Sequence, residues 1–291
     1  MYSGKRKIVV ADGGSTKCSW AIVSYDGGER RINISDTCGV NPIQLNANEI
    51  ETAWRADGKA LFAEMRDAQV IYYYGAGCIG GETNERIVNA IRRLTDVADM
   101  HIEVYSDMLG AARALFGSKS GVACILGTGC NSCLYDGKEI VGNVRPLGYI
   151  LGDEGSGADI GKHIVADALK GMWPSDLTES FYRFADADYQ TIIRRIYSEP
   201  RANAYLASFT RFAAEHIERT EVEQIVKSRF RAFAERNIKL YPKEAVEGNV
   251  GFVGGVAANF EKQLREACKE AGIASDVFIQ QAPIMQLAEN S

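Results

Sequence analysis

One pattern occurs twice along this chain and limits the folds open to it more than any other feature. A short apolar run, residues 8–10, meets a glycine-rich turn, resumes as a second apolar run and ends in Tyr-Asp-Gly at Tyr25. The plan returns in residues 122–126, passes through Gly127-Thr128-Gly129 and reaches another Tyr-Asp-Gly at Tyr135. Each copy of a repeat is expected to form the same supersecondary unit. The sequence therefore predicts a duplicated domain.

The remaining segments alternate between strand and helix patterns, which indicates α/β layers. Strands are expected over residues 69–74, 101–105 and 250–253, and helices over 47–66, 83–97, 107–116, 158–170 and 257–270. Residues 176–240 are rich in helical periodicity. A polar, Gly/Ser-rich link at 117–121 separates an N-terminal lobe, 1–118, from a C-terminal lobe, 119–291. Residues 282–291 allow a brief final helix that can return to the N-terminal lobe.

Composition narrows the function classes. Hydrophobic residues make up 46% of the chain, charged residues 24%, and the net charge is −5, typical of a globular protein without a basic nucleic-acid footprint. The longest apolar runs fall short of a membrane span or a signal-peptide core. Seven scattered cysteines favour reduced thiols and a cytoplasmic location. Cys130 and Cys133 form an isolated C-x-x-C, best interpreted as small residues filling a tight turn.

Two glycine-rich loops follow the first strand of each repeat. In the first, Asp12-Gly-Gly-Ser-Thr-Lys17, backbone N–H groups can converge on an anion, and Asp12 ends a strand where a carboxylate can hold Mg²⁺. In the second, Gly127-Thr128-Gly129 suits another phosphate clamp. Each loop taken alone is equally compatible with an ordinary hairpin. Their equivalent positions in a duplicated frame favour a nucleotide triphosphate held by both.

Three polar residues lie where a cleft would need them. Asp107 follows an expected strand and starts a helix, so it is either a helix cap or a general base. Asp153 lies in Gly152-Asp-Glu-Gly-Ser156, either a helix-leading loop or an acceptor for sugar hydroxyls. Asn41 is a turn residue by default, and its amide can also bind a hydroxyl or a carbonyl.

These motifs together resemble the BadF/BadG/BcrA/BcrD-type ATPase family, and within it the N-acetylglucosamine kinase branch. The resemblance rests on Asp12–Lys17, Ser106-Asp107, Gly127–Gly129, Gly152–Ser156 and Gly254-Gly-Val-Ala257, in order over essentially the whole chain. It implies two ribonuclease-H-like lobes of the actin/Hsp70/hexokinase type, with an interlobe nucleotide cleft. It also implies ATP and Mg²⁺ as cofactors and a small sugar as substrate, and it is compatible with a homodimer.

The resemblance also implies roles for individual residues. Asp107 matches the catalytic base, and Asp12 helps to position Mg²⁺. Positions that match contacts to the ATP phosphates are Gly13, Gly14, Ser15, Thr16, Lys17 and Thr128, and those along the adenosine are Gly254, Gly255 and Ala257. Positions that match sugar contacts are Asn41, Asp107, Cys130, Asn131, Gly148 and Asp153. The expected reaction transfers the γ-phosphoryl group to the 6-hydroxyl of an amino sugar, N-acetylglucosamine first among them.

Two departures put the acceptor in question. Pro146-Leu147 stands where this branch carries Gly-Trp, and Cys130 replaces a usual serine. Kinases for glucosamine, N-acetylmannosamine or N-acetylmuramic acid therefore stay open. Two other functions also stay open. One is an ATPase that activates a partner enzyme; in this family such ATPases carry a cysteine-bound iron–sulfur cluster. The other is a sugar-binding regulator that has lost turnover.

Overall fold

The computed structural model describes residues 6–273 and 277–291, and the chain divides into two compact units. Unit 1 comprises residues 1–117 together with the C-terminal segment Pro283–Ser291, and unit 2 comprises Ser118–Ala282. The chain thus leaves unit 1 after Gly117 and comes back to it at Pro283. Gly117 closes the helix α3 (Asp107–Phe116) with a positive φ of 59°, a conformation that glycine adopts at little cost.

Unit 1 contains a five-stranded sheet in the order β3-β2-β1-β4-β5. Its strands are β1 (Arg6–Gly13), β2 (Lys17–Asp26), β3 (Glu29–Cys38), β4 (Val70–Gly75) and β5 (Ile102–Ser106). β1, β2 and β3 form an antiparallel meander, and β4 and β5 are parallel to β1. The Tyr-Asp-Gly turn lies at the β2–β3 hairpin, as expected, with Asp26 opposite Glu29.

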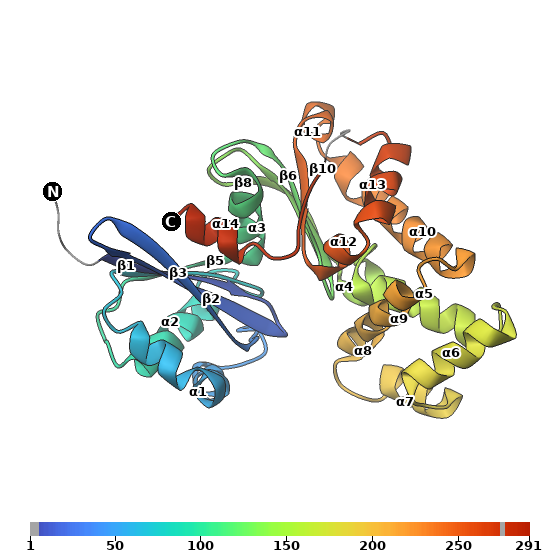
Figure 1. Cartoon of the computed structure of the whole chain (residues 1–291), viewed down its shortest axis with the longest axis horizontal. Helices are drawn as coiled ribbons and strands as arrows, with labels where there is room; N and C mark the ends of the chain where they lie inside the picture. The colour runs from blue at the N-terminus through green and yellow to red at the C-terminus, as the bar shows by residue number, and fades with distance from the viewer. Residues whose placement is uncertain (1–5, 274–276) are drawn as a thin grey trace. The chain divides into compact units, whose positions relative to one another are not determined.

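Unit 2 repeats this plan in its own sheet, in the order β10-β9-β6-β7-β8. Its strands are β6 (Gly121–Leu126), β7 (Cys130–Tyr135), β8 (Ile140–Val144), β9 (Val250–Val253) and β10 (Val277–Gln280). Again three strands form an antiparallel meander, and the two later strands run parallel to the first. The identical topology confirms the duplication predicted from the repeated pattern. Figure 1 shows a sheet with helices packed on it in each unit.

Helices cover both faces of the first sheet. α1 (Ala47–Glu64) and α2 (Glu82–Thr95) enclose an aromatic core around Trp20, Trp54 and Tyr73, which are fully buried. On the other face, α3 and the last helix, α14 (Ile284–Glu289), pack on Ile8 and Val10 of β1. Alternation of side chains along β1 explains this division, because successive residues point to opposite faces.

Unit 2 carries a larger helical region. Its helices are α4 (Gly148–Leu151), α5 (Gly157–Leu169), α6 (Ser175–Ala185), α7 (Tyr189–Tyr197), α8 (Ala202–Ser208), α9 (Thr210–Glu215), α10 (Thr220–Arg236), η1 (Ile238–Leu240), α11 (Lys243–Glu247), α12 (Gly255–Asn259) and α13 (Glu261–Glu270). One apolar core joins them to the sheet.

Two local expectations were wrong. The helix predicted over 257–270 is two helices, α12 and α13, which meet at Phe260. Cys130 and Cys133 belong to strand β7 and are buried, so they are strand residues and do not fill a turn. The turn lies one step earlier, at Gly127-Thr128-Gly129, because the antiparallel pairing of β6 with β7 starts at Leu126 and Cys130.

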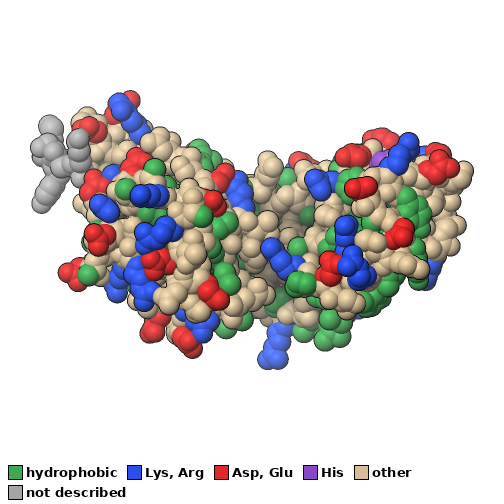
Figure 2. All heavy atoms as spheres, turned by 90° about the horizontal axis from the view of Figure 1, so that it is seen from below, with side chains coloured by type: hydrophobic (Ala, Val, Ile, Leu, Met, Phe, Trp, Pro, Cys, Tyr) green, Lys and Arg blue, Asp and Glu red, His purple; other side chains and the backbone are tan. Residues whose placement is uncertain are grey.

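The visible surface carries charges of both signs. On the face drawn in Figure 2, lysine and arginine side chains alternate with aspartate and glutamate over both units. The helices within the described residues are all too short or too polar to span a bilayer.

Candidate functional site

The predicted site residues of unit 1 gather at the carboxyl edge of its sheet. Gly13 at the end of β1 pairs with Gly75 at the end of β4, and Gly75 pairs with Ser106 at the end of β5. Asp12 precedes the first of these residues and Asp107 follows the last. Three neighbouring parallel strands thus bring two carboxylates, distant in sequence, to one edge, the usual place for a ligand in such sheets.

The first glycine-rich loop is a tight turn held by its own backbone. The Gly14 N–H donates to the Lys17 carbonyl at 2.9 Å, and the Gly39 N–H donates to Thr16 O at 3.0 Å. A Cβ on Gly39 would lie 2.3 to 2.4 Å from backbone atoms of this loop, so only glycine allows that approach. Ser15 is exposed, and the exposed Lys17 pairs with Asp36 at 2.9 Å. The loop therefore presents polar groups to solvent on a fixed frame.

Both carboxylates have raised pKa values, and the charge of Asp107 contributes to the shift at Asp12. The pKa of Asp12 is raised to about 7, first by burial and then by the negative charge of Asp107, while Lys17 acts in the opposite direction. Burial also raises the pKa of Asp107, and the Met108 N–H, 2.8 Å from Asp107 Oδ1, opposes that shift. Two nearby carboxylates that resist ionisation are a common arrangement for a cation site or for acid–base catalysis.

Asn41 lies beside the same edge. Its Oδ1 accepts the Ile43 N–H at 3.0 Å in a local turn, which leaves the side-chain NH₂ as the group it can offer to a ligand. Gly77, in the turn after β4, has a φ of 78°, and a Cβ there would lie 2.2 Å from Asn41 Oδ1. Asn41 thus rests on a glycine that no larger residue can replace.

The second glycine-rich loop lies at the carboxyl edge of the other sheet. The carbonyls of Gly127 and Thr128 accept the first two N–H groups of α5, those of Gly157 and Ala158, at 2.8 and 3.0 Å. The Gly127 N–H donates to Gly129 O at 3.0 Å. Since the first N–H groups of a helix lack intrahelical partners, this loop caps α5 and is fixed by it.

The next residues along the chain begin β7. Asn131 Oδ1 accepts from the Ser132 N–H at 2.8 Å and from Asn143 Nδ2 at 3.0 Å. Burial raises the pKa of the Cys130 thiol well above its ordinary value, with the negative charge of Asp153 as the next cause, so Cys130 is a neutral thiol at physiological pH. It can act as a small, weakly polar wall but not as an anion.

Of the remaining sugar-site candidates, Gly148 is the first residue of α4, and Asp153 follows its end by two residues. Both have positive φ, 73° at Gly148 and 57° at Asp153. Burial raises the pKa of Asp153, and the backbone N–H of Cys130 opposes this shift. Leu147, one of the residues that depart from the family pattern, is 55% exposed. The structure places Asp153, Cys130 and the second loop together within unit 2.

The predicted adenosine motif follows β9. Gly254 has a φ of 117°, and a Cβ there would lie 2.3 Å from the carbonyl oxygen of Leu126. Gly255 is exposed at the start of α12, and Ala257 is buried. Glycine at position 254 therefore lets the turn pass close to the last residue of β6, next to the second loop.

Sequence reasoning missed several residues that shape these edges. Gly75-Ala76-Gly77 supports Asn41, and the Ala76 N–H donates to Gly13 O at 2.7 Å. Tyr73 fills the space under Gly13, whose Cβ would lie 2.2 Å from the tyrosine hydroxyl. A Gly-Ala-Gly directly after an apolar strand was a usable signal for the first. Asp159, whose side chain accepts the Gly155 N–H, gave no signal in the sequence.

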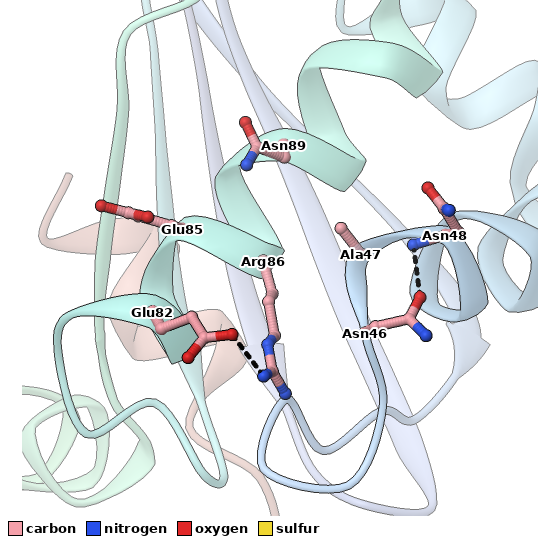
Figure 3. A pocket seen from close by; sticks show the side chains of 7 residues that line it. All are labelled: Asn46, Ala47, Asn48, Glu82, Glu85, Arg86 and Asn89. Carbon is pink, nitrogen blue, oxygen red and sulfur yellow. Dashed lines mark hydrogen bonds and ion pairs between the residues drawn. The ribbon is translucent and has the colours of Figure 1, made fainter.

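A pocket of about 320 Å³ lies apart from these residues, at the N-terminal ends of α1 and α2 (Figure 3). Arg86 lines it, donating to the Pro42 carbonyl at 2.8 Å and pairing with Glu82 at 2.6 Å. Arg86 thereby fixes the segment that follows Asn41.

Within the described residues, no group of three or more His, Cys, Asp or Glu side chains lies close enough together to hold a metal ion.

Comparisons with known proteins agree with this architecture. Over 97% of this chain and 98% of the other, the structure matches a proposed N-acetylglucosamine kinase from Porphyromonas gingivalis, with a TM-score of 0.89 and 38% identity. A second proposed N-acetylglucosamine kinase, from Chromobacterium violaceum, matches over 98% of both chains, with a TM-score of 0.72 and 17% identity. A ROK family glucokinase from Streptomyces griseus, solved with glucose and AMPPNP, matches over 98% and 97% of the two chains, with a TM-score of 0.58 and 14% identity.

The last two structures share the fold, an α/β pair of lobes of the hexokinase type. A comparison with curated proteins finds no match. The model of one family matches residues 11–289, nearly the whole chain. The chain belongs to the BadF/BadG/BcrA/BcrD ATPase family.

Proposed function

We propose that this protein is a sugar kinase that transfers the γ-phosphoryl group of Mg-ATP to the 6-hydroxyl of an amino sugar, N-acetylglucosamine. The observation that carries the proposal is the pair Asp12 and Asp107 at one sheet edge, beside a fixed glycine-rich loop. The 38% identity to a proposed N-acetylglucosamine kinase supports the choice of acceptor.

The residues present fit a magnesium ion. Mg²⁺ is usually held by one or two carboxylates, with substrate phosphates and water completing its shell. Asp12 offers such a carboxylate at the carboxyl edge of the sheet, beside the first glycine-rich loop. Burial and then the charge of Asp107 raise its pKa, and a cation bound there would favour its ionised form. When bound, the ion would neutralise charge on the β- and γ-phosphates.

Asp107 is the proposed base. It accepts the proton of the sugar hydroxyl as the hydroxyl oxygen forms a bond to the γ-phosphorus and the bond from that phosphorus to the bridging oxygen of ADP breaks. A raised pKa makes its carboxylate a better proton acceptor than an ordinary aspartate. Its Met108 N–H contact fixes one carboxylate oxygen, so the other is available to the substrate.

The other predicted residues take binding roles in this proposal. Residues 13–17 and Thr128 hold the phosphates, and Gly254, Gly255 and Ala257 lie along the adenosine. Asn41 donates from its NH₂ to an acceptor oxygen of the sugar, such as a hydroxyl or an acetamido carbonyl, since its own oxygen is engaged. Asp153 accepts from sugar hydroxyls, while Cys130, Asn131 and Gly148 complete the wall.

The test is ADP release from Mg-ATP across N-acetylglucosamine, glucosamine, N-acetylmannosamine, N-acetylmuramic acid and glucose, with Asp107→Asn as control. Release that depends on N-acetylglucosamine and is lost in the control would support the proposal. Release that depends on another sugar would keep the kinase and change the acceptor. Release without sugar would indicate an ATPase that serves a partner protein. No release would favour a sugar-binding protein without turnover.

A further inference from the structure

The acidic loop, residues 152–156, and the second glycine-rich loop are joined through the start of α5. The N–H groups of Gly157 and Ala158 donate to the carbonyls of Gly127 and Thr128. The acidic loop leads directly into these two residues. A shift of the acidic loop would therefore move the first turn of α5 and, with it, the two N–H groups that hold the carbonyls of Gly127 and Thr128.

A second contact joins the loops directly. Asp153 Oδ2 lies 3.0 Å from the point where a Cβ on Gly129 would be. The Cys130 N–H, next in the chain, lowers the pKa of that carboxyl group, so it stabilises the ionised form. Asp153 holds a left-handed backbone with a φ of 57°, which costs about 1 kcal/mol or more for a residue other than glycine. Other contacts must therefore hold the acidic loop in this conformation.

Asp159 supplies that restraint. Its side chain is 4% exposed, and Oδ2 accepts the Gly155 N–H at 3.1 Å. Ser156 Oγ accepts the Asp159 backbone N–H at 3.2 Å and caps the helix. Two cationic side chains lie close to the buried carboxylate, Lys162 at 3.2 Å and Arg229 at 3.9 Å, and the imidazole of His163 lies 3.5 Å away. A buried charge persists only with such partners, because leaving it unpaired is strongly unfavourable.

We propose that Asp159 is a positioning residue that holds the acidic loop so that the Asp153 carboxylate stays against Gly129. This arrangement couples the acidic loop, which would contact the sugar, to the second glycine-rich loop, which would contact the phosphates. These two binding roles rest on the proposed function; the contacts between the loops do not. Occupancy of Asp153 by a sugar would then favour the loop conformation that binds nucleotide, so the two substrates bind with positive coupling.

The first test needs no ligand. Amide hydrogen exchange of the full chain is compared for the wild type, Asp159→Ala and Asp167→Ala, a control aspartate two turns further along the same helix. We expect exchange in peptides covering 127–130 and 152–158 to be at least about tenfold faster in Asp159→Ala and unchanged in the control. Asp159→Asn should restore much of the protection, because its amide oxygen can still accept the Gly155 N–H.

A second variant keeps the proposal falsifiable if Asp159→Ala does not fold. Asp153→Ala changes a partly exposed side chain and removes the contact of its carboxylate with residues 129–130. Amide exchange of residues 127–130 should again become faster. Wild-type exchange at 127–130 in either folded variant would overturn the proposal, even if the melting temperature fell. A failure of Asp159→Asn to restore protection would contradict the role given to the Gly155 bond.

Kinetics and binding then test the coupling. In Asp159→Ala the KM values for sugar and ATP should both rise by about tenfold or more, with a smaller change in kcat. The affinity for Mg-ADP should increase with sugar in the wild type and lose that dependence in the variant. Absence of sugar-dependent turnover in the wild type would refute the kinase proposal alone, because the exchange experiment decides the positioning role independently.

Discussion

At the residue scale, the chemistry proposed for unit 1 depends on two carboxylates with unlike surroundings. Asp12 is the last residue but one of β1 and responds to the charge of Asp107, whereas Asp107 begins α3 and accepts the neighbouring Met108 N–H. The first arrangement favours binding of a cation, and the second favours transfer of a proton. The two roles can be tested separately, because replacing either aspartate by asparagine keeps the shape of the side chain.

Asp107→Asn should leave Mg-ADP affinity within about threefold of the wild type and lower kcat by about 10²-fold or more, the usual range for loss of a general base. The amide keeps the volume of the side chain but cannot accept the proton. Calorimetric titration with Mg-ADP and single-turnover phosphoryl transfer check the two halves. Parallel losses of nucleotide binding and turnover would assign Asp107 to the nucleotide site instead.

Asp12 predicts a pH dependence of stability without ligands. Its folded pKa of about 7 exceeds the ordinary 3.8, so between these values the folded state binds the proton more tightly than the unfolded state. The free energy of unfolding should therefore fall as pH rises from about 4 to 7, by up to roughly 4 kcal/mol at 1.4 kcal/mol per unit. Asp12→Asn should remove this fall, which urea denaturation measures.

The matched comparison isolates Asp12, because the raised pKa values of Asp107 and Asp153 act in both proteins. Saturating Mg-ADP should flatten the wild-type curve, since a cation favours the ionised carboxylate. Parallel curves for wild type and Asp12→Asn would show that Asp12 has an ordinary pKa.

At the element scale, glycine contacts determine where the loops can lie. Gly39 follows β3 and touches the first glycine-rich loop, although 25 residues separate it from Gly14 in the chain. Gly254 gives the corresponding close approach in unit 2, against Leu126 at the end of β6. In both sheets a small residue at a strand end allows the neighbouring loop to lie against the sheet.

Gly39→Ala should therefore displace the first loop. Its Cβ would lie 2.3 Å from Gly14 O, and backbone atoms cannot rotate away as a side chain can. We expect a loss of about 2 kcal/mol or more in the free energy of unfolding and at least about tenfold weaker Mg-ADP binding. Gly142→Ala, where the nearest atom is an ordinary 3.4 Å away, serves as control and should change both by little. Equal effects of the two substitutions would contradict this explanation.

The sequence predicted the parts of the fold that depend on local pattern. Strand 250–253 matched β9, helix 107–116 matched α3, and the repeated turns revealed the duplicated sheet topology. It did not predict contacts that depend on register. Gly75 lies between Gly13 and Ser106 only because β4 lies between β1 and β5. Asp159 resembled any polar residue in a helix until the structure placed it under the acidic loop.

At the scale of the whole molecule, the path of the chain makes unit 1 depend on residues beyond unit 2. α14 lies on the face of the first sheet formed by Ile8 and Val10, and its residues Ile284 and Leu287 are buried there. Arg30 bonds to the Ala288 carbonyl, which ties the helix to β3. Unit 1 therefore cannot complete its core until the last residues of the chain are present.

Leu287→Ala should destabilise unit 1 selectively. The side chain is 4% exposed, and truncation of a buried leucine costs about 2–5 kcal/mol, whereas Met285→Ala on the same helix, at 40% exposed, should cost far less. Hydrogen exchange should accelerate in β1 and β2 and stay unchanged in β6 and β7. Phosphoryl transfer should fall with the population of folded unit 1, because Asp12 and Asp107 both belong to it. Equal acceleration in both sheets would show instead that the two units unfold together, and that α14 stabilises the whole chain.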